Sequence, residues 1–259
     1  MYESLNGKRV LLTGHTGFKG AWMTVWLNKL GAKVYGLSNT KNKFFPDFSK
    51  YVVKEYDQDI RSNYILPSIL KEINPQIVIH FAAQPIVSES YQNPAETFGV
   101  NVGGTLNLFD SLVKCKELSS VLVVTTDKVY KHPEKMNTED DEIGGAKDPY
   151  SYSKACVELV VESYRQLYKD VKIATARGGN VIGGGDFGKD RIIPDCVRAA
   201  HQHKPMYIRN PTYTRPWQYV LDLLNGYLKL IDAMERNLVN GGVWNFGPSD
   251  KTYSVIEVV

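Results

Sequence analysis

The sequence predicts a doubly wound α/β fold, in which helices cover both faces of a parallel sheet. Three observations predict it: short apolar runs of strand length, helical stretches between them, and a glycine-rich turn after the first run. The runs are continuously apolar, which is typical of strands buried on both faces. They read KRVLLT (8–13), AKVYGL (32–37), QIVIHF (76–81), SVLVVT (120–125) and VKIATA (171–176).

Helices are predicted between these strands. After the first strand, Met23, Trp26, Leu27 and Leu30 recur at the spacing of one helical face, and Gly31 ends the helix. Strands separated by helices imply right-handed crossovers and therefore parallel pairing. Further helical stretches are expected over 62–74, 93–116 and 149–168.

The pattern changes at residue 178, where glycine and proline become dense and the predicted elements become short. We therefore predict two parts, residues 1–177 and a smaller C-terminal lobe over 178–259. Ser254 begins an apolar helix that stops without a C-terminal cap, so we expect the chain to be shortened at this end. Within the lobe, helices are expected near 192–203 and 220–236, and strands near 206–209 and 243–246.

Composition excludes several classes of protein. With 259 residues, 43% of them hydrophobic and 23% charged, the chain can bury a core and is not a disordered protein. A net charge of +3 without a basic block gives no reason to expect a nucleic-acid or membrane partner. Cys115, Cys156 and Cys196 are odd in number and far apart, so we expect neither disulfides nor a metal site. No signal sequence or spanning segment is visible, and a cytoplasmic location is expected.

The turn after the first strand reads GHTGFKG (14–20). Glycines at this spacing allow a tight turn, bring the backbone close to a diphosphate, and let the helix pack against the sheet. The helix N-terminus then offers N–H groups to the anion. The position after a buried strand favours a Rossmann-type dinucleotide site over a plain tight turn. Residues 1–177 are therefore the predicted dinucleotide-binding domain, and 178–259 the predicted substrate lobe.

The second strand ends without the acidic residue that commonly binds the ribose 2′-hydroxyl, because residues 36–41 read GLSNTK. Lys41 could tolerate a 2′-phosphate, so NAD and NADP both stay open. Asp59, after the third strand, could accept a hydrogen bond from the adenine amino group or could equally cap a helix.

Tyr150 and Lys154 lie four residues apart and share one helical face. An ammonium and a cationic nicotinamide would favour the phenolate, which could remove a hydroxyl proton as hydride leaves the same carbon. A pair at this spacing is commonly only a surface pair. Tyr152 has Cys156 four residues on, so it is not part of such a pair.

Polar residues follow the fourth apolar run, where the chain reads Thr126-Asp127-Lys128. The carboxyl ends of strands in a doubly wound sheet are where ligands bind. Taken alone, this stretch is more simply a polar loop, but the glycine-rich turn and the Tyr–Lys pair favour a site. Five glycines in residues 178–185 are suited to exposing backbone N–H groups to a second diphosphate.

Taken in order, these motifs resemble the extended short-chain dehydrogenases/reductases that act on nucleotide sugars, and within them the CDP-glucose 4,6-dehydratases. Asp127-Lys128 carries the narrower resemblance, because the sugar 4-epimerases have small or hydroxyl residues there and the dTDP-glucose dehydratases have Asp-Glu. The resemblance spans residues 7–259. Its motifs are GHTGFKG (14–20), HFAAQP (80–85), TTDKVY (125–130), GGAKDPYSYSKAC (144–156), ARGGNVIGGGD (176–186), DRIIPD (190–195), RPWQYVL (215–221) and WNFGP (244–248).

The resemblance implies an NAD-dependent hydro-lyase that converts CDP-glucose to CDP-4-keto-6-deoxyglucose. Transient oxidation at C4, loss of water across C5 and C6, and hydride return would leave no net redox change. In this scheme Tyr150, paired with Lys154, takes the 4-hydroxyl proton, Thr126 hydrogen-bonds the 4-oxygen, and Asp127 protonates the leaving 6-hydroxyl. Lys128 is either a neutral base for the C5 proton or a cation that stabilises the enolate, and both roles stay open. The cytosine base is implied by the resemblance alone.

The resemblance also implies contacts with the cofactor and the substrate. The cofactor contacts are Gly14, Thr16, Gly17, Phe18, Lys19, Gly20, Asp59, Ile60, Ala82, Ala83, Gln84, Asn101, Tyr150 and Lys154. The substrate contacts are Asn180, Arg215 and, as weaker candidates, Arg191, Arg209 and Trp217; core packing is the alternative for Trp217. Helices 93–116 and 149–168 imply a homodimer or homotetramer. A nucleotide-sugar 4-epimerase and a catalytically silent NAD(P)-binding relative are the alternative functions, and surface-polysaccharide biosynthesis is the implied pathway.

Overall fold

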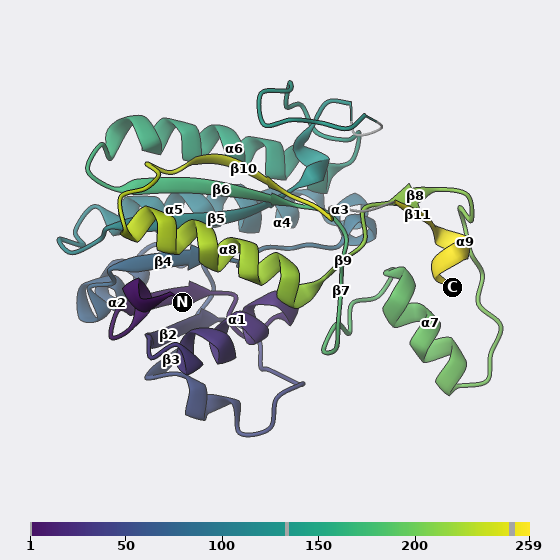
Figure 1. The fold of residues 1–259 in the computed structure, drawn as a ribbon, viewed down its shortest axis with the longest axis horizontal. Coiled ribbons are helices and arrows are strands. Elements are labelled where there is room, and N and C mark those ends of the chain that lie inside the picture. The colour runs from purple at the N-terminus through teal and green to yellow at the C-terminus, as the bar shows by residue number, and fades with distance from the viewer. Residues whose placement is uncertain (1, 133–134, 249–251) are drawn as a thin grey trace.

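The computed structural model describes residues 2–132, 135–248 and 252–259, and its centre is a seven-stranded parallel sheet (Figure 1). The strand order is β10-β6-β5-β4-β1-β2-β3, and all neighbours pair in parallel. The doubly wound fold predicted from the apolar runs is therefore confirmed. The strands are β1 (Arg9–Thr13), β2 (Lys33–Ser38), β3 (Lys54–Asp57), β4 (Ile77–His80), β5 (Ser120–Thr126), β6 (Lys172–Gly178) and β10 (Gly242–Phe246).

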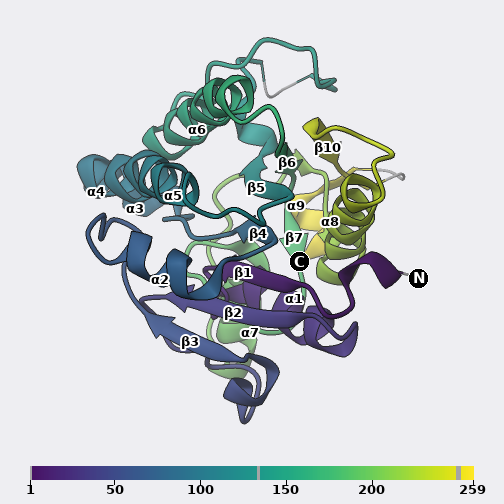
Figure 2. The same ribbon diagram turned by 90° about the vertical axis from the view of Figure 1, so that its left-hand side faces the viewer.

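Helices cover both faces of this sheet (Figure 2). On one face lie α1 (Phe18–Lys29) and α8 (Val220–Glu235), and on the other lie α2 (Leu66–Ile73), α5 (Gly104–Leu112) and α6 (Pro149–Leu167). Within β1, Val10 and Leu12 belong to one hydrophobic cluster and Leu11 to the other. Burial on both faces explains why the runs are continuously apolar.

The helix predicted over 93–116 is interrupted. Instead, α3 (Val87–Gln92) and α4 (Pro94–Phe98) are followed by a π-helical turn at Gly99–Gly103, and only then by α5. The wide turn surrounds Asn101, whose buried side chain accepts a hydrogen bond from Gln84 N and donates one to Ser153 Oγ. A π-helical turn inside a helix is frequent at functional sites.

Two elements beyond residue 177 belong to the sheet, although we expected them in the second lobe. Strand β10 pairs with β6, and α8 packs beside α1. The smaller lobe then consists of 179–219 and 252–259. It contains β7 (Val181–Ile182), α7 (Ile192–His201), β8 (Thr214–Arg215), β9 (Gln218–Tyr219), β11 (Tyr253–Ser254) and α9 (Val255–Val258).

The strand predicted over 206–209 is wrong, since these residues form none. Met206 and Ile208 line a cavity instead of pairing with a neighbouring strand. At the C-terminal end, Ser254 caps α9 as predicted, in a capping box with Glu257. None of the helices in the described parts of the chain has the length and hydropathy needed to cross a bilayer.

Candidate active site

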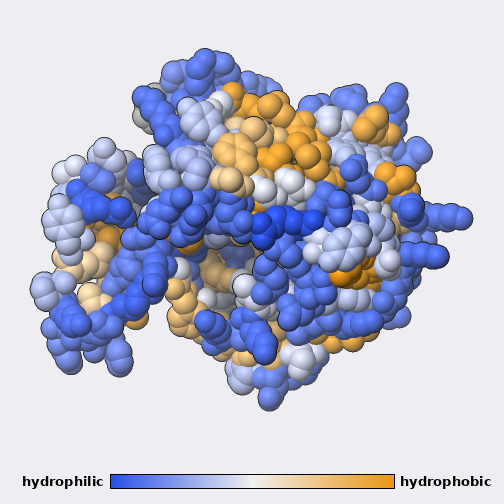
Figure 3. Space-filling model, turned by 180° about the vertical axis from the view of Figure 1, so that it is seen from behind, coloured by the Kyte–Doolittle hydropathy of each residue, from blue (hydrophilic) through white to orange (hydrophobic). Residues whose placement is uncertain are grey.

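Two adjacent cavities lie at the carboxyl ends of the sheet strands. The smaller, of about 230 Å³, is bounded by the glycine-rich turn, and the larger, of about 700 Å³, lies between the sheet and the smaller lobe. Phe18, Lys19, Pro85 and Arg191 line both. Figure 3 shows the surface hollowed between the lobe and the main body. This is the edge of a doubly wound sheet where ligands bind.

The glycine-rich turn has the shape that a dinucleotide requires. Gly14 has φ +68°, and a Cβ there would lie 2.8 Å from Ala82 N. A Cβ on Gly20 would lie 2.1 Å from Gly14 O, so the first turn of α1 can pack against the loop only without a side chain. Gly14, Gly17 and Gly20 line the smaller cavity together with the start of α1. These residues fit a diphosphate held by the N–H groups of the turn and the helix.

Most of the other predicted cofactor contacts line the same cavity. Asp59, Ile60, Ala82 and Ala83 do so, at the ends of β3 and β4. Thr16 is absent from the lining, but it hydrogen-bonds to two residues that belong to it.

Gln84 and Asn101 line neither cavity. Gln84 N donates to Asn101 Oδ1 over 2.8 Å, and Asn101 Nδ2 donates to Ser153 Oγ over 2.8 Å. Ser153 Oγ in turn donates to the carbonyl oxygen of Tyr150. The two residues therefore connect the segment after β4 to the start of α6.

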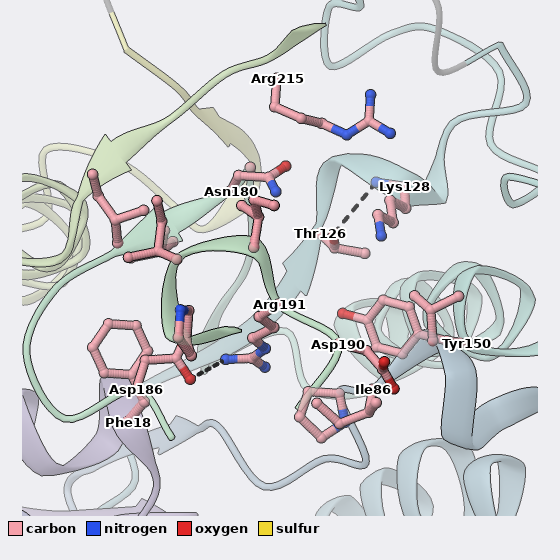
Figure 4. Close-up of a pocket in the computed structure, with 18 of the residues that line it drawn as sticks. Phe18, Ile86, Thr126, Lys128, Tyr150, Asn180, Asp186, Asp190, Arg191 and Arg215 are labelled. Atoms are coloured by element: carbon pink, nitrogen blue, oxygen red, sulfur yellow. Dashed lines mark hydrogen bonds and ion pairs between the residues drawn. The ribbon is translucent and has the colours of Figure 1, made fainter. Parts of the chain in front are cut away.

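Tyr150 lies at the start of α6 and lines the larger cavity, with Asp148 as the helix cap. Burial raises the pKa of Tyr150 to about 12, although a hydrogen bond with Thr126 and the charge of Arg191 oppose this effect. Figure 4 shows Thr126, Lys128 and Tyr150 around one space. The phenol therefore needs a nearby positive charge before it can act as a base near neutral pH.

Lys154 supplies such a charge from one turn along the same helix. Its Nζ is buried and donates to the carbonyl oxygen of Val124 over 3.2 Å. Burial and the charge of Lys19 lower the pKa of Lys154 to about 7, and Glu158 opposes them. The ammonium is thus poised to change its charge near neutral pH, which is typical of functional sites.

Asp127 and Lys128 follow directly after β5 and line the larger cavity. Burial raises the pKa of Asp127, against the hydrogen bond from Thr126 Oγ1 and the charges of Lys128 and Arg215. The Lys128 Nζ lies 5.9 Å from the centroid of the Tyr150 ring. A half-buried carboxyl group and the amino group of a lysine therefore lie beside the phenol.

The predicted substrate contacts all line the larger cavity: Asn180, Arg191, Arg209, Arg215 and Trp217. Arg191 Nη1 lies 2.8 Å from Asp186 Oδ1, and Figure 4 shows this pair. The Trp217 indole N–H donates to the carbonyl oxygen of Tyr253, which ties the ring to the C-terminal strand. Three guanidinium groups in one cavity suit an anionic ligand.

Helix α1 and the loop after β2 both contact the smaller lobe beside the site. Trp22 Nε1 donates to the carbonyl oxygen of Gly184 over 2.8 Å. Phe44 packs against Trp22 and against Gly185, where a Cβ would lie 2.8 Å from the Phe44 ring. A segment beside the smaller cavity is thereby tied to the smaller lobe.

Glu158 was not anticipated, although it continues the four-residue spacing of Tyr150 and Lys154. Its carboxylate forms a buried ion pair with Arg177 at 3.1 Å and accepts hydrogen bonds from Thr125 and Thr175. These contacts join α6 to the ends of β5 and β6.

Asp190 was also not predicted as a site residue, and no regular spacing from another site residue indicates it. It accepts a hydrogen bond from Ser88 Oγ over 2.6 Å, across 102 residues of chain. Both residues line the larger cavity, so the contact joins α3 to the smaller lobe at the cavity wall.

The chain is similar to known proteins over almost its whole length. It is 39% identical to the CDP-glucose 4,6-dehydratase of Salmonella typhimurium, over 98% of this chain and 74% of that protein. It is 28% identical to a UDP-glucose 4-epimerase of Neisseria meningitidis, over 97% and 80% of the two chains. The fold matches the structure of an epimerase from Methanothermobacter thermautotrophicus with a TM-score of 0.85, at 26% identity over 99% of this chain and 76% of that one.

A second solved structure contains the cofactor. This is the UDP-glucose 4-epimerase of Thermus thermophilus in complex with NAD, with a TM-score of 0.81 at 25% identity, over 96% of this chain and 80% of that one. The model of the NAD dependent epimerase/dehydratase family matches residues 10–247. A match of this extent, over the cavities just described, assigns the chain: it belongs to the NAD-dependent epimerase/dehydratase family.

Proposed function

We propose that the chain dehydrates CDP-glucose to CDP-4-keto-6-deoxyglucose, with NAD as a cofactor that is regenerated in each cycle. The observation that carries the proposal is Asp127, a half-buried carboxyl group that lines the larger cavity beside Thr126 and Tyr150 and has a raised pKa. Elimination of a hydroxyl group requires an acid at this point, whereas epimerisation at C4 does not. The 39% identity to a CDP-glucose 4,6-dehydratase supports the same choice.

In this proposal the glycine-rich turn and the start of α1 hold the dinucleotide. NAD, when bound, accepts the hydride from C4 and returns it to C6. Asp59 and Ile60 would contact its adenosine part, and Ala82 and Ala83 line the same cavity.

Tyr150 removes the 4-hydroxyl proton. The Lys154 ammonium, one helical turn away, stabilises the phenolate, and Thr126 hydrogen-bonds to the sugar oxygen that is being deprotonated. Burial keeps the free phenol protonated, with its pKa raised to about 12, so the base forms only when positive charge is present.

Asp127 then protonates the 6-hydroxyl as it leaves. Its raised pKa keeps a proton available at a higher pH than an exposed aspartate would. Lys128 stands on the same wall and either takes the C5 proton as a neutral amine or stabilises the enolate as a cation. The diphosphate would bind along Asn180 and Arg215, with Arg191, Arg209 and Trp217 nearby.

Incubation with CDP-glucose and NAD tests the proposal. A 4-keto sugar gives a chromophore in alkali, an epimerase gives CDP-galactose without a ketone, and a silent protein leaves the substrate unchanged. If CDP-glucose gives no ketone but UDP-glucose or dTDP-glucose does, the proposed cytosine base is wrong and the proposed dehydration stands.

The Asp127→Asn variant tests the acid separately. Oxidation at C4 and C5 deprotonation need only the other residues, so this variant should exchange the C5 hydrogen with deuterium oxide while forming little 4-keto-6-deoxy product. Asp140→Asn, at an exposed position, is the matched control and should retain product formation. Normal dehydration by Asp127→Asn would remove the proposed role.

We also propose that two copies pair through α5 and α6. Apolar side chains gather over α6 in Figure 3. Leu106 on α5, Leu159 and Leu167 on α6, and Val113 directly after α5 are exposed. A homodimer in light scattering supports this proposal, and a monomer that persists at high concentration contradicts it. A cytoplasmic location and a place in surface-polysaccharide biosynthesis are proposed from the resemblance alone.

A further inference from the structure

Three hydroxyl groups meet at the end of β2, beside the smaller cavity. Thr16 Oγ1 lies 2.7 Å from Ser38 Oγ and 2.9 Å from Thr40 Oγ1, and the latter two lie 3.2 Å apart. The Thr40 N–H also donates to Ser38 Oγ. Ser38 and Thr40 line the smaller cavity. We refer to these three side chains as the hydroxyl cluster.

Dinucleotide folds that select NAD commonly place a carboxylate near this position, where it accepts hydrogen bonds from the ribose hydroxyls. The same negative charge repels the 2′-phosphate of NADP. Residues 36–41 of this chain contain no carboxylate. The hydroxyl cluster occupies this place instead.

The carboxylates in and after the neighbouring strand β3 do not take the place of the missing carboxylate. Asp59 lines the cavity, but its oxygens accept hydrogen bonds from Arg61 Nε and Nη2, over 2.9 and 2.7 Å, and from Asn39 Nδ2. The Arg61 hydrogen bond holds the pKa of Asp59 below its usual value, so its negative charge is present but paired. Asp57, the register partner of Ser38, is exposed and outside the cavity lining.

A hydroxyl group can donate as well as accept a hydrogen bond. The hydroxyl cluster can therefore accept from a ribose 2′-hydroxyl or donate to the oxygens of a 2′-phosphate. Lys41 and Lys43 follow Thr40 closely in the sequence and are both exposed, so they add positive charge after the hydroxyl cluster. Neither the hydroxyl cluster nor these two lysines would repel the 2′-phosphate of NADP.

We infer that the chain binds NADP as well as NAD, and that Thr16, Ser38 and Thr40 determine this dual specificity. The inference rests on the dinucleotide site of the family and not on the proposed dehydration. If the protein fails to dehydrate CDP-glucose, the inference is unaffected.

Fluorescence titration of the full chain, freed of bound dinucleotide, with NADH and with NADPH tests it. The two dissociation constants should agree within about tenfold, because no unpaired carboxylate faces the 2′ position. A preference for NADH above tenfold, or no measurable binding of NADPH, overturns the inference.

The variant Ser38→Asp tests the assignment to the hydroxyl cluster. A carboxylate at this position should weaken NADPH binding relative to NADH by at least about 30-fold at low salt, because like charges then face each other. Ser49→Asp is the matched control: it adds the same charge at an exposed position nearby and should keep the wild-type ratio. Thr40→Asp serves as the second test should Ser38→Asp fail to fold by circular dichroism. An unchanged ratio in the folded variant refutes the assignment.

Discussion

Glu158→Gln should destabilise the protein strongly, because it breaks a buried ion pair. The side chains of Arg177 and Glu158 are 4% and 3% exposed, and the guanidinium would be left beside a neutral amide. Removing one partner of a buried pair costs about 3–5 kcal/mol. Tyr130 Oη and the Glu139 carbonyl oxygen still accept from Arg177, so we expect about 3 kcal/mol. For a chain of this size, that corresponds to a fall in Tm of about 6–12 °C.

Thermal unfolding followed by circular dichroism would measure this, with Arg177→Met and the double variant completing a cycle. The double variant should lose less stability than the sum of the two single variants, because no uncompensated charge is left buried. Glu162→Gln is the control: it lies on the same helix and pairs with Arg165, but its side chain is 51% exposed, and we expect under about 1 kcal/mol. A fall in Tm below about 3 °C for Glu158→Gln, or full additivity in the cycle, would refute the reasoning.

Three further outcomes are expected. Tyr150→Phe should lower the kcat for 4-keto sugar formation by about 10²–10⁴, because the base is lost; a loss below tenfold would exclude that role. Native Lys154 releases its proton near pH 7 but the unfolded chain only near 10.5, so stability in urea should rise with pH between these values, by up to about 1.4 kcal/mol per unit. Lys154→Met should flatten that rise, and an equal slope in both proteins would contradict the lowered pKa of Lys154. Finally, turnover retained in Lys128→Arg but lost in Lys128→Met would exclude the neutral-base role of Lys128, whereas loss in both variants would favour it.

The sheet was predictable because strands that are buried on both faces form continuous apolar runs in the sequence. A strand such as β1 or β5 can contain almost only apolar residues, and the helices between them identify parallel pairing. The lobe was harder to read. Residues 206–209 have strand-like composition, but Met206 and Ile208 line a cavity, and local composition does not distinguish the two environments.

The break in the helix over 93–116 illustrates a second limit. Its apolar periodicity is real, and α5 keeps it. The π-helical turn, however, arises from the hydrogen bonds of Asn101 with Gln84 and Ser153, which lie far apart in sequence. Periodicity along a helix carries no information on such contacts. The same reason explains why β10 and α8 were assigned to the wrong part of the molecule.

The site was predictable where its chemistry is local. The glycine-rich turn and the Tyr150–Lys154 spacing each lie within a few residues, and the structure brings them to the same edge of the sheet. The hydroxyl cluster and the Ser88–Asp190 contact were not predictable, since each depends on side chains that lie far apart in the sequence. Only the missing carboxylate after the second strand pointed to the former.

The contacts of Trp22 and Phe44 with the glycines of the smaller lobe bear on how long a dinucleotide stays bound. These contacts tie α1, whose first residues line the smaller cavity, to the smaller lobe, so the two halves should separate rarely and we expect a bound dinucleotide to dissociate slowly. In the proposed reaction this carries no penalty for turnover, because the cofactor ends each cycle in the oxidation state in which it began. Only the sugar nucleotide must exchange in each cycle.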